Sequence, residues 1–158
     1  MPDKLEEYRR KVVGTNIDPR SLLSTDYFNT FNSVVMVLDL LPDAPDLLEE
    51  VEQWQFYDYI GHFQRSGLDF AQLAIEVYPY APADLREAFE RKINAMRIIV
   101  EEMARTLRRL SIAGEQDLFI EYAQMARIWF NKLTEEANGI VHGSGGEALN
   151  QGAIDKLF

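Results

Sequence analysis

The feature that most constrains the fold is an apolar seam that runs along residues 83–113 with a helical period. Its positions are Phe89, Ile93, Met96, Val100, Met103, Leu107 and Leu110. These residues recur at alternating intervals of 4 and 3, which place them on one face of an α-helix. Pro82 precedes the segment and Gly114 follows it, as expected of a helix start and a helix stop. The spacing therefore predicts one long helix, about 45 Å in length.

A second helix is predicted directly after Gly114. It opens at Gln116 or Asp117 and repeats the spacing, with apolar residues at Phe119, Tyr122, Ala126, Trp129 and Leu133. Because so few residues connect the two helices, they must lie side by side and antiparallel. We therefore expect an all-α fold, an antiparallel helical bundle built on a long helical hairpin. The seam fits packing within this bundle, and it also fits a homodimer through the hairpin.

The chain before the hairpin indicates shorter helices. Residues 1–17 show no long apolar period and are expected to form a flexible N-terminal arm. Asp18-Pro19 is typical of a helix start, and a further helix is predicted between Thr25 and Leu41. The aromatic run from Trp54 to Phe63 fits a strand or a helix. We favour a helix, because Gly67 can then end it.

Composition narrows the class of protein. At 158 residues, of which 47% are hydrophobic, the chain suits one folded domain. It has no cysteine, which excludes disulfides and thiolate metal sites. Its formal charge of −10 repels a phosphate backbone, so nucleic-acid binding is not expected from this acidic protein. No apolar stretch approaches the roughly 20 residues of a membrane span, and the start is no signal peptide. We expect a cytoplasmic protein.

The C-terminal end has an organisation of its own. Its glycines are Gly139, Gly143, Gly145 and Gly146. They predict a Gly-rich linker over 139–148, since glycine does not sustain a helix. Residues 149–158 then form a short amphipathic peptide, which Asn150 can cap. The helical domain is accordingly expected to span residues 18–138.

This final peptide resembles the receiver-binding motif of flagellar motor switch proteins and of the chemotaxis phosphatase CheZ. That motif runs Leu-Ser-Gln-x-Glu-Ile-Asp-x-Leu-Leu/Phe, and the matching residues here are Leu149, Gln151, Ile154, Asp155, Leu157 and Phe158. Asn150 stands in place of the serine and Ala153 in place of the glutamate. The resemblance implies that the peptide docks on a CheY-like response regulator receiver domain, with the apolar residues as anchors and Gln151 and Asp155 as polar contacts.

Catalytic alternatives rest on weaker patterns. A receiver phosphatase needs an acid and an amide on one helical face, and Glu49 with Gln53 or Asp26 with Asn29 has such a spacing. Chance alone supplies pairs of this kind in a chain with so many acids and amides. His62 precedes Arg65 by three residues, as in histidine phosphotransfer sites, but Ser66 stands where those sites have glycine. No metal site or cofactor is expected.

The preferred interpretation is therefore a non-catalytic adaptor or regulator in two-component or chemotaxis signalling. A receiver-domain phosphatase or a histidine phosphotransfer protein is one alternative. A structural helical protein, whose C-terminal peptide docks on its own body, is the other.

Overall fold

The structure is a computed structural model that describes residues 2–143, and its regular elements there are all helical. In chain order they are α1 (Pro2–Lys11), η1 (Thr25–Phe31), α2 (Asn32–Leu40), η2 (Pro45–Leu47), α3 (Leu48–Glu52), α4 (Tyr59–Ser66), α5 (Ala71–Val77), η3 (Tyr78–Tyr80), α6 (Ala83–Ile112) and α7 (Gln116–Val141). The predicted all-α fold is confirmed. Within these residues, no helix combines the length and the apolar character that a membrane span requires.

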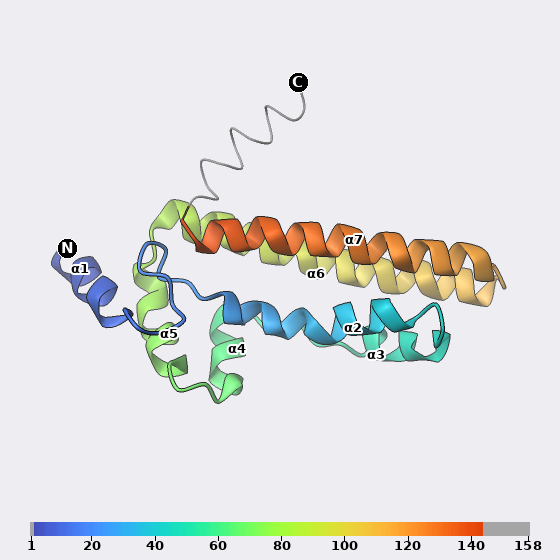
Figure 1. The fold of residues 1–158 in the computed structure, drawn as a ribbon, viewed down its shortest axis with the longest axis horizontal. Helices are drawn as coiled ribbons and strands as arrows, with labels where there is room; N and C mark the ends of the chain where they lie inside the picture. Colours follow the sequence, from blue (N-terminus) through green and yellow to red (C-terminus); the bar gives the residue numbers. More distant parts are fainter. Residues whose placement is uncertain (1, 144–158) are drawn as a thin grey trace, which may run out of the picture.

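The long hairpin is the largest unit of the fold. Helices α6 and α7 lie side by side and antiparallel, as Figure 1 shows. Gly114 joins them with a φ of +72°, a left-handed conformation that glycine adopts without steric cost. Six of the seven seam positions on α6 are buried, and the seventh, Leu110, is partly buried against the core. The sequence therefore predicted the inward face of α6 correctly.

The inward face of α7 differs from the expected one. Phe119 and Ala126 are buried as predicted, but Tyr122 and Leu133 are only partly buried and Trp129 is 50% exposed. The buried positions are Phe119, Ala123, Ala126, Phe130, Ala137, Ile140 and Val141. The reason is that α7 packs against α2 as well as α6, so its buried face turns toward the space between these two neighbours. Three alanines on this face allow both helices to approach closely.

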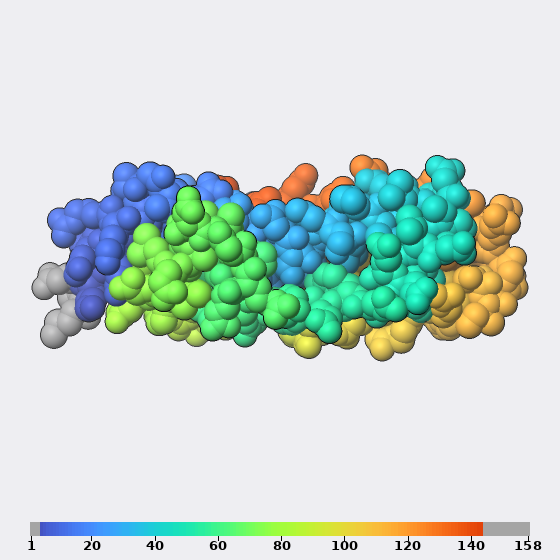
Figure 2. Space-filling view, turned by 90° about the horizontal axis from the view of Figure 1, so that it is seen from below, coloured from blue at the N-terminus to red at the C-terminus, as the bar shows by residue number. Residues whose placement is uncertain are grey.

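The shorter helices cover one side of the hairpin. In Figure 2, α2, α3, α4 and α5 spread over the face that is turned to the viewer, and parts of α6 and α7 show at its margins. Helix α1 belongs to this layer as well. Tyr8 and Val12 are buried, and the Tyr8 hydroxyl donates to Glu76 of α5 over 3.2 Å. The expectation of a flexible arm over residues 1–17 is therefore wrong for the part that packs here, because these side chains join the core.

The aromatic run divides into an irregular segment and a helix. The indole of Trp54 donates to the Thr30 carbonyl over 2.8 Å, and residues 54–58 lie outside any helix. Helix α4 begins only at Tyr59, where the carboxylate of Asp58 caps it by accepting from the Gly61 amide at 2.8 Å. The predicted helix is therefore right for the second half of the run and wrong for the first. Gly67 ends α4 with a φ of +69°, as predicted.

Phe89 of α6 contacts aromatic side chains of η1 and α4, and its replacement tests how much this contact contributes to stability. Its buried ring lies 5.6 Å from the rings of Tyr27 and Tyr59 and 5.8 Å from that of Phe28. We expect Phe89→Ala to lower the free energy of unfolding by about 3–5 kcal/mol, because the cavity cannot close fully. Urea denaturation measures this. The control Ile112→Ala removes a side chain that is 79% exposed and should change stability by less than about 0.5 kcal/mol.

Candidate functional site

A tight loop before η1 occupies the place where the sequence indicated a helix start. The Asp18 carboxylate accepts from the Arg20 amide at 2.8 Å, and the Asp18 carbonyl accepts from the Leu22 amide at 2.7 Å. Leu22 has a φ of +59°. Asp18-Pro19 therefore begins a turn and not a helix, because the aspartate side chain binds the backbone two residues further along.

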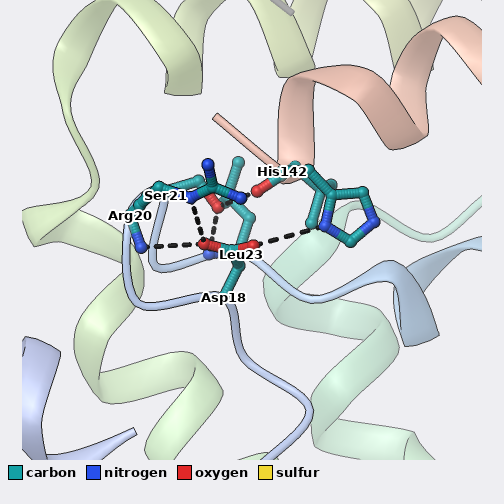
Figure 3. A network of polar contacts seen from close by, with 6 residues as sticks. Asp18, Arg20, Ser21, Leu23 and His142 are labelled. Atoms are coloured by element: carbon teal, nitrogen blue, oxygen red, sulfur yellow. Dashed lines mark hydrogen bonds and ion pairs between the residues drawn. The ribbon is translucent and has the colours of Figure 1, made fainter. Parts of the chain in front are cut away.

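This loop holds the C-terminal end of α7, in an arrangement that we call the C-terminal clamp: Asp18, Arg20, Ser21, His142 and Gly143. The buried Ser21 hydroxyl donates to the Val141 carbonyl and accepts from the Leu23 amide at 3.1 Å. Asp18 Oδ2 lies 3.3 Å from His142 Nδ1, and Arg20 Nε lies 3.6 Å from Asp18 Oδ1 (Figure 3). Carbonyls at a helix end lack intrahelical partners, and the serine satisfies one of them.

Gly143 completes the clamp. Its φ is +81°, and a Cβ at this position would lie 3.2 Å from the Cβ of Arg20. Gly139, in contrast, lies within α7, so the expectation that the linker begins at residue 139 is wrong. A single glycine is tolerated there, because the surrounding turns of α7 are packed on the core. The remaining linker residues 144–148 and the peptide 149–158 lie outside the described residues.

The two candidate phosphatase pairs are occupied by local contacts. On the exposed face of α3, the Gln53 amide donates to Glu49 at 3.2 Å. In η1, Asp26 accepts from Asn16 at 2.7 Å, whereas Asn29 accepts from Asn32 at 3.1 Å. The first pair therefore binds to itself, and the second pair is split between different partners. Glu49, Gln53 and Asn29 nevertheless remain exposed, so these contacts do not block access to them.

His62 lies on α4 against the aromatic core. Its ring packs edge-on to those of Tyr27, at 5.4 Å, and Phe63, at 5.0 Å. Burial lowers its pKa below the usual value, while a backbone hydrogen bond and the charge of Asp26 act in the opposite direction. Nε2 is buried without a hydrogen-bond partner among the described residues. A phosphotransfer histidine must present a ring nitrogen to the incoming receiver, and this Nε2 is not exposed.

A groove of about 660 Å³ opens between α3 and α6, and no sequence pattern predicts it. Val51, Trp54, Phe56, Val100 and Ala104 supply its apolar lining. Three arginines, Arg105, Arg108 and Arg109, lie along it. Arg108 binds Glu52 with two hydrogen bonds, of 2.9 and 2.5 Å, which lowers the pKa of that carboxyl. The predicted helix through Trp54 concealed this groove, because an irregular segment is what places Trp54 and Phe56 beside α6.

Metal chemistry and known relatives add no further assignment. Residues 2–143 contain no group of three or more histidine, aspartate and glutamate side chains that could hold a metal ion. Comparisons with protein-family models, with curated proteins and with solved structures find no match to this chain. The function must therefore be inferred from the residues themselves.

Two glycines provide a matched test of the clamp. We expect Gly143→Ala to lower the free energy of unfolding by about 1–2 kcal/mol, since alanine is strained at positive φ and its Cβ approaches Arg20. Gly139→Ala should raise the free energy of unfolding by about 0.5–1 kcal/mol, because a Cβ there meets nothing within 4 Å and alanine favours a helix. Denaturation of both variants checks the pair. Equal effects would show that the clamp does not constrain Gly143.

The lowered pKa of His62 predicts a pH dependence of stability. The unfolded chain binds the proton near pH 6.5, whereas the folded protein binds it only at lower pH. Protonation therefore favours the unfolded state, and the contribution of His62 should decline as the pH falls through about 6.5 toward the folded pKa. Thermal melts of the wild type and His62→Gln between about pH 7.5 and pH 5.5 measure this. The difference in Tm should shrink on acidification, and His142, present in both proteins, cancels.

Proposed function

We propose that this protein is a non-catalytic adaptor that binds a CheY-like receiver domain through its C-terminal peptide, residues 149–158. The proposal rests on the six residues that match the receiver-binding motif, Leu149, Gln151, Ile154, Asp155, Leu157 and Phe158. The amphipathic spacing of its apolar residues suits a helix that lies in a groove of its partner.

The C-terminal clamp is the structural observation that supports this role best. It fixes Val141 and His142 to the loop at one end of the bundle, with Gly143 next to Arg20 (Figure 1). Only the five residues 144–148 separate this anchor from the peptide. Five residues span at most about 17 Å when fully extended. The adaptor would therefore hold its receiver close to the clamp.

Simple energetics predict a modest affinity. The peptide has four apolar anchors, Leu149, Ile154, Leu157 and Phe158, and burial of each contributes about 1.5–3 kcal/mol. Ordering the backbone of the peptide costs about 1–2 kcal/mol per residue. These terms are of similar size, so one peptide should bind in the micromolar range or more weakly. Such an affinity suits a reversible signalling contact.

The geometry of the catalytic candidates favours an adaptor over an enzyme. Glu49 and Gln53 bind to each other, and Asp26 and Asn29 bind different neighbours. The Nε2 atom of His62 is buried against the aromatic core. A phosphatase would need the acid and the amide directed together toward the receiver, and a phosphotransfer protein would need an accessible histidine nitrogen.

Pull-down experiments test the proposal. Full-length protein and a version that lacks residues 149–158 are each used as bait, and the bound proteins are identified by mass spectrometry. We expect receiver domains with the full-length bait only. In calorimetric titration of a captured receiver, with and without beryllofluoride as a phosphate mimic, Phe158→Ala should weaken binding about ten- to a hundredfold through the lost apolar anchor.

Lys156→Ala is the matched control, because the motif allows any residue at that position. It should leave the Kd almost unchanged. Equal capture of receivers by both baits would contradict the role of the peptide. Faster loss of phosphate from a labelled receiver in the presence of the protein would contradict the non-catalytic part of the proposal.

A further inference from the structure

Helix α7 carries a second apolar face in addition to its buried one. We call it the α7 stripe: Leu118, Met125, Ile128 and Trp129, which are between 48% and 64% exposed. Leu118, Met125 and Trp129 recur at intervals of 7 and 4, so they lie in one line along the helix. Single exposed apolar residues are ordinary, but a continuous row of large ones marks an interaction surface.

The surface continues from the α7 stripe onto α6. A shallow hollow of about 280 Å³ lies beside Trp129, lined by Ile99 of α6 and by Lys132, Leu133 and Glu136 of α7. Glu136 is bound to Lys92 of α6 through an ion pair of 2.6 Å. The apolar surface is therefore shared by both helices of the hairpin and is as rigid as the hairpin itself.

Two opposite charges flank the α7 stripe. Glu121 and Lys132 lie 11 residues apart, which is close to three helical turns, so they share one side of α7. Neither side chain forms an ion pair within the described part of the chain, in contrast to Arg127, which binds Asp39 of α2. The charges are therefore available to a partner that approaches the stripe.

We propose that a second copy of this chain covers the α7 stripe, with the two α7 helices antiparallel across a two-fold axis. An axis between residues 126 and 127 places Glu121 of each copy opposite Lys132 of the other. The same axis lies midway between Met125 and Ile128, so these apolar residues meet across it as well. A two-fold interface has to be complementary to itself, and this arrangement of charges and apolar residues satisfies that requirement.

The dimer also determines how far apart the two C-terminal clamps lie. Because the helices run in opposite directions, the two C-terminal clamps lie at opposite ends of the particle. Each Gly143 is about 16 residues from the axis, so the two anchors are about 50 Å apart. The assembly would hold the two anchors of the C-terminal peptides at opposite ends, whichever partner the peptides bind. The inference goes beyond the receiver-binding proposal and does not depend on it.

A charge-swap experiment on the full-length chain tests this interface. Sedimentation equilibrium should show a dimer for the wild type. Glu121→Lys and Lys132→Glu should each raise the dimer dissociation constant about tenfold or more, because each creates two like-charge contacts across the axis. The double variant, Glu121→Lys with Lys132→Glu, should restore dimerisation, since the exchanged charges again pair with their opposites. Circular dichroism confirms that each variant remains helical.

Glu87→Lys is the matched control. It makes the same charge change at an exposed position of α6 away from the α7 stripe, and it should leave the dissociation constant unchanged. A monomeric wild type, or a double variant that remains as weak as the single ones, would overturn the inference. A chain that dimerises only when residues 149–158 are removed would also overturn it, because its own peptide would then cover the stripe. Receiver capture is measured separately, so its failure leaves the dimer intact.

Discussion

The close packing of α6 on α7 is the constraint on which the rest of the structure depends. The apolar seam of α6 is buried at six of its seven positions, and the turn at Gly114 joins the two helices. Helices α2 and α3 pack directly on this hairpin, α2 against α7 and α3 against α6. Aromatic rings from Tyr27, Tyr59 and Phe89 connect the two layers. The C-terminal clamp therefore lies at one end of the hairpin, and the α7 stripe lies on its exposed side.

How well periodicity predicts the inward face of a helix depends on how many apolar rows the helix carries. The seam of α6 was predicted well, because its inward face is marked by one row of large apolar residues. Helix α7 has two apolar rows, and its large residue Trp129 lies on the exposed one while alanines fill much of the buried one. Periodicity alone does not show which row faces inward. The packing of α7 against α2 and α6 buries the alanine-rich row, and this depends on tertiary structure.

Local motifs were less informative than the seam. Asp18-Pro19 has the residues of a helix start but forms a turn, since Asp18 binds both its own loop and His142. Trp54 lies outside any helix, contrary to the prediction, and its indole donates to the Thr30 carbonyl. The contacts of Asp18 with His142 and of Trp54 with Thr30 join segments distant in sequence, so neither could be found from spacing. The acid and amide pairs showed the opposite problem, because their spacing was suitable and their side chains were already occupied.

The clamp has a consequence for how the protein is made. Ser21 binds the carbonyl of Val141, 120 positions later, so both α6 and α7 must leave the ribosome before this contact can form. Contacts between such distant residues form late, because the entropy of closing the long loop has to be overcome first. The clamp can therefore close only after α7 has been made.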